Sequence, residues 1–192
     1  HQQDELVRQR IQQQARFNRL ANRLIASTDE LNELADSLVA NAAATSSAIT
    51  SNLYDLVQNY ASKQQLYRVF DRLVEVDLDA MERMYELRLR SANLNGLFNR
   101  VTKESDLPGL NALREQTTKT LNILKRRVNE INDPQRRQKA KELLSSMLLD
   151  STPDDANGIF DTRASLVAIR AALAQVSVGT AEASQALNDI VN

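Results

Sequence analysis

Apolar residues recur along most of this chain at alternating spacings of three and four residues, which keeps them on one face of an α-helix. Toward the C-terminus the stripe is uninterrupted, at Leu166, Ile169, Leu173, Val176, Thr180, Ala183, Leu187 and Ile190. Neither Gly nor Pro follows it, and the chain begins without Met in sequence that already reads as helix. We therefore expect both ends to continue into a larger protein.

The first predicted helix is unusually long, because neither Gly nor Pro occurs before Gly96. Its stripe comprises Leu24, Thr28, Leu31, Ala35, Leu38, Ala42, Thr45 and Ile49, and then Leu53, Leu56 and Tyr60. A helix of about sixty residues would be roughly 85–90 Å long at ~1.5 Å per residue. This length predicts an elongated molecule.

Four further helices are predicted from caps and breaks. Ser62 is an N-cap candidate for the second helix, which should end between 93 and 104, and Asn95-Gly96 is its candidate kink or end. The third helix should open at Asp106-Leu107-Pro108, with Pro in its first turn. Its stripe is Leu110, Leu113, Thr117, Leu121, Leu124, Val128 and Ile131. Asp133-Pro134 should start the fourth helix, whose core-facing residues would be Ala140, Leu143, Leu144 and Met147. A loop at 151–158 precedes the fifth helix.

The composition favours an all-α fold, since only four Gly and three Pro leave little room for turns between strands. We predict an elongated antiparallel helical bundle with long first and last helices. It would be a four-helix bundle, or two such bundles stacked end to end, in a single domain over 1–192.

Several classes of protein are disfavoured. The formal net charge of −1 gives no general attraction to nucleic acid. The chain has no cysteine, which excludes disulfides and thiol chemistry and fits an oxidising compartment. The longest uncharged run, 37–54, is too rich in Ser, Thr and Asn to cross a bilayer, so no transmembrane segment is predicted.

No catalytic residue, metal ligand or cofactor is predicted. His1 is the only histidine, so no interior Ser-His pair or histidine metal site can form, and no Gly-rich phosphate loop is present. The carboxylate pairs Glu30–Glu33 and Glu82–Glu86 each share a helix face. Such spacings are common on solvated helices and indicate no active site by themselves.

A basic segment covers the middle of the chain, at Lys125, Arg126, Arg127, Arg136, Arg137, Lys139 and Lys141. It could dock an anionic ligand or acidic partner, or it could be a solvated face. We favour the second interpretation, because acidic residues of the second helix could neutralise it: Asp71, Glu75, Asp77, Asp79, Glu82 and Glu86.

Three tyrosines, Tyr54, Tyr60 and Tyr67, lie near the predicted turn between the first two helices. They are the candidates for a ligand-binding site or partner surface, because aromatic rings with a polar tip suit both. The alternative is that they close the end of a core.

Two stretches and the helical layout around them resemble the periplasmic domains of bacterial transmembrane sensor kinases and chemoreceptors, most closely the trimethylamine-N-oxide sensor kinases. The stretches are Asn41–Leu56 (NAAATSSAITSNLYDL) and Asn157–Leu173 (NGIFDTRASLVAIRAAL). The chain is short for two complete bundles, which departs from that family. No binding residue can be transferred from it.

The resemblance implies an extracytoplasmic signal-input domain of an inner-membrane receptor, tethered by flanking membrane segments and dimeric in the full protein. It would sense a small molecule or a periplasmic binding protein and pass a helix displacement of ~1–2 Å to a cytoplasmic kinase or methyl-accepting module. A membrane-proximal part, 1–30 plus 170–192, would then adjoin a membrane-distal part, 31–169. The domain would not be an enzyme, although the full-length protein could be a histidine kinase. A structural or adaptor bundle that senses nothing is the alternative.

Overall fold

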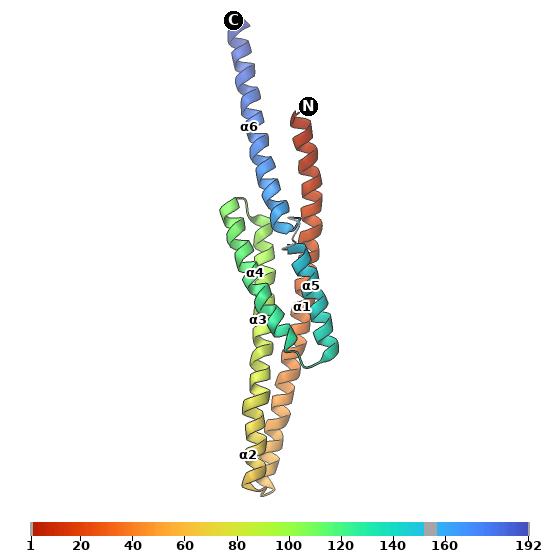
Figure 1. The fold of residues 1–192 in the computed structure, drawn as a ribbon. Helices are drawn as coiled ribbons and strands as arrows, with labels where there is room; N and C mark the ends of the chain where they lie inside the picture. The colour runs from red at the N-terminus through yellow and green to blue at the C-terminus, as the bar shows by residue number, and fades with distance from the viewer. Residues whose placement is uncertain (1, 152–156, 192) are drawn as a thin grey trace. The chain divides into compact units, whose positions relative to one another are not determined.

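The structure is a computed structural model that describes residues 2–151 and 157–191, and within these ranges it contains helices and no strands (Figure 1). The elements are α1 (Gln2–Gln58), α2 (Lys63–Arg72), the π-helix η1 (Leu73–Leu78), α3 (Asp79–Lys103), α4 (Leu107–Asn129), α5 (Pro134–Ser151) and α6 (Ile159–Val191). The all-α fold and the long first and last helices are thus confirmed.

Side-chain caps fix the starts of three helices where the sequence predicted them. Ser62 forms a capping box with Gln65, whose backbone N–H donates to the serine hydroxyl while its side chain accepts from the Ser62 backbone N–H. The Asp106 carboxylate accepts from the backbone N–H of Gly109 at 2.7 Å, and Asp133 accepts from that of Gln135 at 2.9 Å. These bonds satisfy donors that have no partner inside the helix.

The chain divides into two compact units, and α1, α3, α4 and α5 contribute residues to both. Unit 1 comprises 1–25, 97–118 and 147–192, and unit 2 comprises 26–96 and 119–146. The predicted division into a membrane-proximal and a membrane-distal part stays a prediction.

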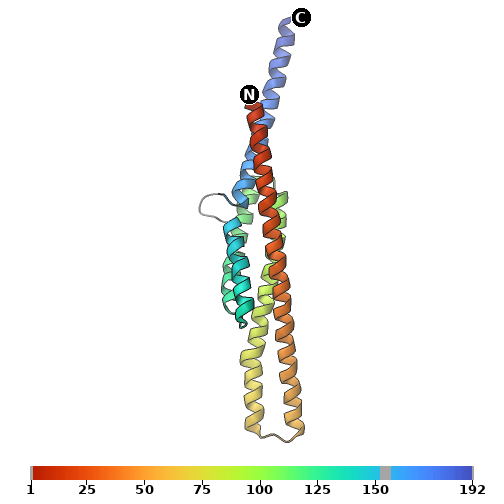
Figure 2. The same ribbon diagram turned by 90° about the vertical axis from the view of Figure 1, so that its right-hand side faces the viewer.

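In unit 1 the start of α1 packs against α6, which runs in the opposite direction (Figures 1 and 2). The guanidinium of Arg163 on α6 lies over the ring of Phe17 on α1 at 5.3 Å. The buried core of this unit is formed by Phe17, Leu20, Ala21, Leu24, Leu97, Phe98, Val101, Leu110, Leu113, Met147, Ile159, Phe160 and Leu166.

In unit 2 the helices α1, α3, α4 and α5 supply a four-helix core. Every predicted stripe residue of α4 and α5 is buried, in whichever unit it lies. The α1 stripe is buried as far as Leu38, whereas Ile49, Leu53 and Leu56 are only half-buried. No residue of α2 or η1 is buried.

The predicted end of this helix between 93 and 104 is confirmed, since α3 ends at Lys103, but the helix does not end at Asn95-Gly96. The flanking side chains of Leu94, Leu97 and Phe98 are buried, and this packing outweighs the low helix propensity of glycine. The interruption of the regular α-helix lies earlier, in the π-helix η1. In the predicted loop, Ser151 still belongs to α5 and residues 152–156 lie outside the described ranges.

One helix bears on the expectation of no membrane-spanning segment. Among the described residues one stretch of α6, Ile159–Leu187, is long and apolar enough to cross a bilayer by length and composition. Its mean hydropathy comes from many Ala and Val residues and few charges. Its first residues, Ile159 and Phe160, are nevertheless buried against protein, so the criterion alone does not make it a membrane span.

Candidate functional site

The sequence candidates lie on a helical hairpin in unit 2, formed by α1 and by the chain that returns through α2, η1 and α3. In two antiparallel helices, the residues that immediately follow inward-facing positions point to the same side of the pair, because each residue turns by ~100°. Asp36 follows buried Ala35, and Arg88 follows buried Leu87. Their side chains form an ion pair of 2.5 Å, which confirms this geometry.

A second contact lies on the same side of the hairpin. Asn95 follows buried Leu94, and Asp29 follows buried Thr28. The Asn95 amide donates to the Asp29 carboxylate at 2.6 Å.

The opposite side of the hairpin is covered by α4 and α5. Glu30, which precedes buried Leu31, pairs with Lys139 of α5 at 2.8 Å. Glu86, which precedes buried Leu87, pairs with Arg127 of α4. The two helices therefore pack on one side, and in the described chain they leave the side of Asp36 and Arg88 uncovered.

On that uncovered side, the part of the hairpin nearest its turn presents apolar side chains. Each follows a half-buried, inward-facing residue: Leu53, Leu56, Leu66, Val69 or Leu73. We call this surface the tip face, and it comprises Tyr54, Val57, Tyr67, Phe70 and Val74. Tyr54 is 68% exposed, Tyr67 65% and Phe70 52%, and an exposed apolar group of this kind is typical of an interaction surface.

Tyr60 lies in the turn itself and is 96% exposed. Its φ of 55° is left-handed, and it occupies the residue position after the C-cap of α1 in a Schellman motif. The Ala61 N–H donates to the Leu56 carbonyl at 3.0 Å, and the Tyr60 N–H donates to the Val57 carbonyl at 3.3 Å. A bulky residue is thus held where glycine is usual.

The three predicted tyrosines are therefore near one another in the chain, but they differ in setting. Tyr54 and Tyr67 lie on the tip face, whereas Tyr60 projects from the turn. Because all three are largely exposed, none of them closes a hydrophobic core. A role in binding stays a prediction. Phe70, Val57 and Val74 were not predicted as site residues from the sequence. Each directly follows an inward-facing apolar residue of its helix, and this spacing could have identified them.

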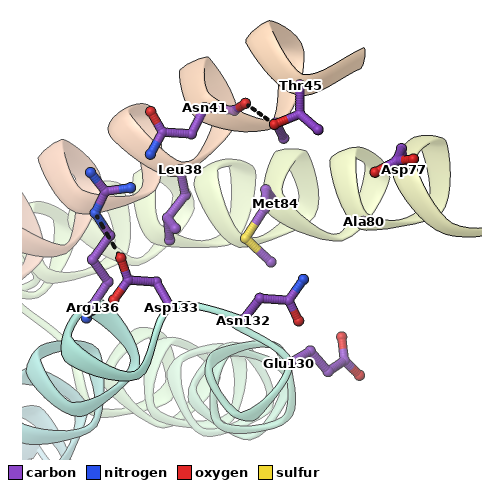
Figure 3. A pocket seen from close by; sticks show the side chains of 11 residues that line it. Leu38, Asn41, Thr45, Asp77, Ala80, Met84, Glu130, Asn132, Asp133 and Arg136 are labelled. Carbon is purple, nitrogen blue, oxygen red and sulfur yellow. Dashed lines mark hydrogen bonds and ion pairs between the residues drawn. The ribbon is translucent and has the colours of Figure 1, made fainter. Parts of the chain in front are cut away.

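Unit 2 also contains a cavity of about 230 Å³, bordered by residues from α1, η1, α3, the α4–α5 connection and α5 (Figure 3). Buried Leu38 and Met84 form its apolar wall. Arg136 lies at its edge, and its Nε approaches Asp133 Oδ2 to 3.8 Å. After exchange of its amide O and N, Asn41 also accepts from this guanidinium. The charges at the edge are thus largely satisfied within the protein.

The basic segment is paired in part: among the described residues, Arg127, Arg136 and Lys139 form ion pairs with carboxylates. Arg127 donates to Glu130 at 2.8 Å and to Glu86, and these hydrogen bonds raise the pKa of Arg127. The hydrogen bond with Glu30 likewise raises the pKa of Lys139. Arg137 donates to the Ile131 carbonyl at 3.1 Å. Predicted neutralisation by the second helix is confirmed for Glu86.

Comparison with known proteins agrees with this architecture. The family model described as "Sensor protein TorS, sensor domain" matches residues 1–192. The sensor protein TorS of Escherichia coli (strain K12) is 31% identical over 133 residues, which are 69% of this chain and 14% of that protein.

A solved structure is also similar: the TorS sensor domain in complex with TorT in the presence of TMAO. It matches with a TM-score of 0.83 at 23% identity, over 94% of this chain and 64% of that chain. At this identity the match shows the fold. The present chain is shorter than both relatives, spanning about a seventh of one and under two thirds of the other.

Proposed function

This chain belongs to the TorS sensor-domain family, and from that premise we propose that it docks a periplasmic binding protein through the tip face. Family membership makes the chain a periplasmic signal-input domain, as the resemblance implied, rather than a catalytic one. The solved structure is a complex of a TorS sensor domain with TorT in the presence of TMAO.

One observation supports the tip face as the docking surface. Five apolar side chains from two antiparallel segments lie on the side of the hairpin that α4 and α5 leave open. Aromatic residues are enriched at the energetic centres of interfaces, since they bury a large area at small entropic cost. Tyr54, Tyr67 and Phe70 would provide such a centre.

The experiment measures binding of this domain to a TorT-type protein of the same organism by isothermal titration calorimetry, with and without TMAO. Tyr54→Ser and Phe70→Ser should each raise Kd by about tenfold or more, because each removes a large apolar contact. Leu149→Ser is the matched control. Leu149 is 71% exposed but lies in unit 1, so its loss should leave Kd unchanged.

Two outcomes would count against this proposal. Equal Kd values for wild type and both tip-face variants would place the docking surface elsewhere. A rise in Tm caused by TMAO alone would instead support direct sensing of the small molecule, because a ligand that binds only the folded state stabilises it by mass action.

We further propose that the full-length receptor is a homodimer tethered to the inner membrane, with 1–30 and 170–192 as its membrane-proximal part and 31–169 as its distal part. The second half of α6 supports this, since Leu187 of its apolar stripe is 64% exposed. The cysteine-free chain allows a direct test by oxidative cross-linking. Ala183→Cys, on the apolar stripe, should cross-link two copies, whereas Gln185→Cys, about 200° around the helix, should not.

A further inference from the structure

Unit 1 contains a small cavity of about 120 Å³ that is lined by three arginines. Arg10 and Gln14, one turn apart, come from α1, and Arg163 and Arg170, two turns apart, come from α6. These spacings place each pair on one helix face. The remaining lining residues are Ser105, Leu166 and Val167, so no carboxylate lines the cavity.

Arg163 is held in place by two contacts that leave part of its guanidinium available. Its Nε donates to the Glu104 carbonyl at 2.6 Å, and its plane lies over the ring of buried Phe17. Burial lowers the pKa of Arg163. The nearby charge of Glu104 raises the pKa, and that of Arg170 lowers it. Neither Nη atom has a hydrogen bond or ion pair within the described residues.

The other two arginines lack a direct partner within the described residues. In the described part of the chain, Arg10 and Arg170 make no hydrogen bond or ion pair, whereas Arg16, Arg23 and Arg114 of the same unit each have a partner. Three guanidinium groups beside one small cavity repel each other. An anion between them would remove that repulsion and accept several charge-assisted hydrogen bonds.

We propose that this cavity binds a small oxyanion of the size of phosphate or sulfate. Arginine suits this ligand because its planar fork of donors matches the spacing of oxyanion oxygens. The ion would accept hydrogen bonds from Arg163 Nη and from Arg10 and Arg170. The Ser105 hydroxyl lines the same cavity. The ligand would bridge α1 and α6, and its binding would favour one spacing of these two helices over others.

The test is thermal unfolding of the full chain in increasing sodium phosphate, and separately in sodium sulfate, against sodium chloride at equal ionic strength. Wild type should show a saturable rise in Tm, about 3–6 °C at ten times Kd. The double variant Arg10→Gln/Arg170→Gln should lose this rise, because it removes two of three positive charges. Neither side chain makes an interaction that the fold needs, so the variant should remain folded.

Arg100→Gln is the matched control, since Arg100 is an exposed arginine of unit 1 that does not line the cavity. It should keep the wild-type response. The control also separates binding from the general stabilising effect of sulfate and phosphate on folded proteins, which all variants would share. Two results would overturn a free-ion site. One is a rise in Tm in the double variant that equals the rise in wild type, and the other is a wild-type Tm that rises no more in phosphate or sulfate than in chloride.

A second arm distinguishes a free ion from a lipid headgroup of the same chemistry. Co-sedimentation with vesicles of phosphatidylglycerol is compared with vesicles of phosphatidylcholine. If the site binds a free ion, phosphate should raise the Tm, and the protein should sediment no more with phosphatidylglycerol vesicles than with phosphatidylcholine vesicles. Sedimentation with phosphatidylglycerol that Arg10→Gln/Arg170→Gln removes, with no response to free phosphate, would assign the cavity to a lipid phosphate. The absence of both responses would overturn the proposal.

Discussion

Asp36 of α1 and Arg88 of α3 form an ion pair on the uncovered side of the unit 2 hairpin. Tyr54 follows Asp36 by eighteen residues, which is five turns at ~3.6 residues per turn, so the two lie in line along α1. The uncovered side is therefore polar and paired beside the four-helix core and apolar near the turn. This change along one side of the hairpin identifies the tip face.

The Asp36–Arg88 pair should stabilise the fold only slightly. Both side chains are more than half exposed, at 57% and 54%, so water competes for each partner. A double-mutant cycle with Asp36→Ala and Arg88→Ala, followed by urea unfolding, should give a coupling energy below ~1 kcal/mol. The coupling should also fall with added salt. A salt-independent value of several kcal/mol would show that something covers this side of the hairpin.

Tyr60→Gly should stabilise the domain. The left-handed φ of Tyr60 costs an L-residue about 1–2 kcal/mol, and part of this gain is offset by the greater freedom of glycine when unfolded. We expect a net gain of about 0.5–1 kcal/mol, or roughly 1–4 °C in Tm at this size. The control is Tyr67→Gly, which should destabilise because it puts glycine inside α2.

A lower Tm for Tyr60→Gly would mean that the tyrosine makes contacts that outweigh its backbone strain. A higher Tm together with weaker binding to the TorT-type protein would indicate that the strained residue is retained for docking.

Asp150→Asn should raise stability at neutral pH. The Asp150 side chain is 6% exposed, and its desolvation raises its pKa, an effect that the ion pair with Arg23 only partly offsets. The pKa of Asp150 is therefore higher in the folded protein than in the unfolded chain. As pH rises from the unfolded to the folded pKa, ionisation of Asp150 lowers the free energy of unfolding, and this loss persists at pH 7.

The measurement is Tm for both proteins between pH 3 and pH 7. The variant should exceed wild type at pH 7, and the difference should shrink toward pH 3, where the wild-type carboxyl is neutral. A variant less stable than wild type at pH 7 would show that the pair with Arg23 outweighs the desolvation cost.

Most of the fold could be predicted from the chain because helices leave periodic signals. The α4 stripe from Leu110 to Ile131 is buried throughout, and the caps at Ser62, Asp106 and Asp133 start helices as expected. The error at Gly96 has a tertiary cause, since buried Leu97 and Phe98 keep the helix intact.

The candidate site was less predictable. Tyr54 and Tyr67 could be singled out from the sequence as aromatic residues near a turn. That both belong to the tip face depends on which side of the hairpin α4 and α5 cover, and this is a tertiary feature. The arginine cavity combines Arg10 with Arg163 and Arg170, which are about 150 residues away in the chain. Nothing in local spacing indicates that such distant residues meet.

The hairpin near its turn should open more readily than the four-helix core. No residue of α2 or η1 is buried, whereas α3 buries Met84, Leu87, Leu94 and Phe98. Regions with few buried apolar contacts open locally at low free-energy cost. In native-state hydrogen exchange, amides of 45–78 should show at least tenfold less protection than those of 84–98, about 1.4 kcal/mol or more in opening free energy.

Amides of 121–128 in α4 are the internal control, since Leu121, Leu124 and Val128 are buried, and they should match the protected part of α3. Adding the TorT-type protein should raise protection selectively over 45–78, because the tip face would then be covered. In the domain without partner, amides of 45–78 and 84–98 could instead show equal protection that does not change when the protein is diluted. That result would mean that the hairpin is stabilised within one chain. The tip face would then have no need of a partner, and the docking proposal would lose its physical basis.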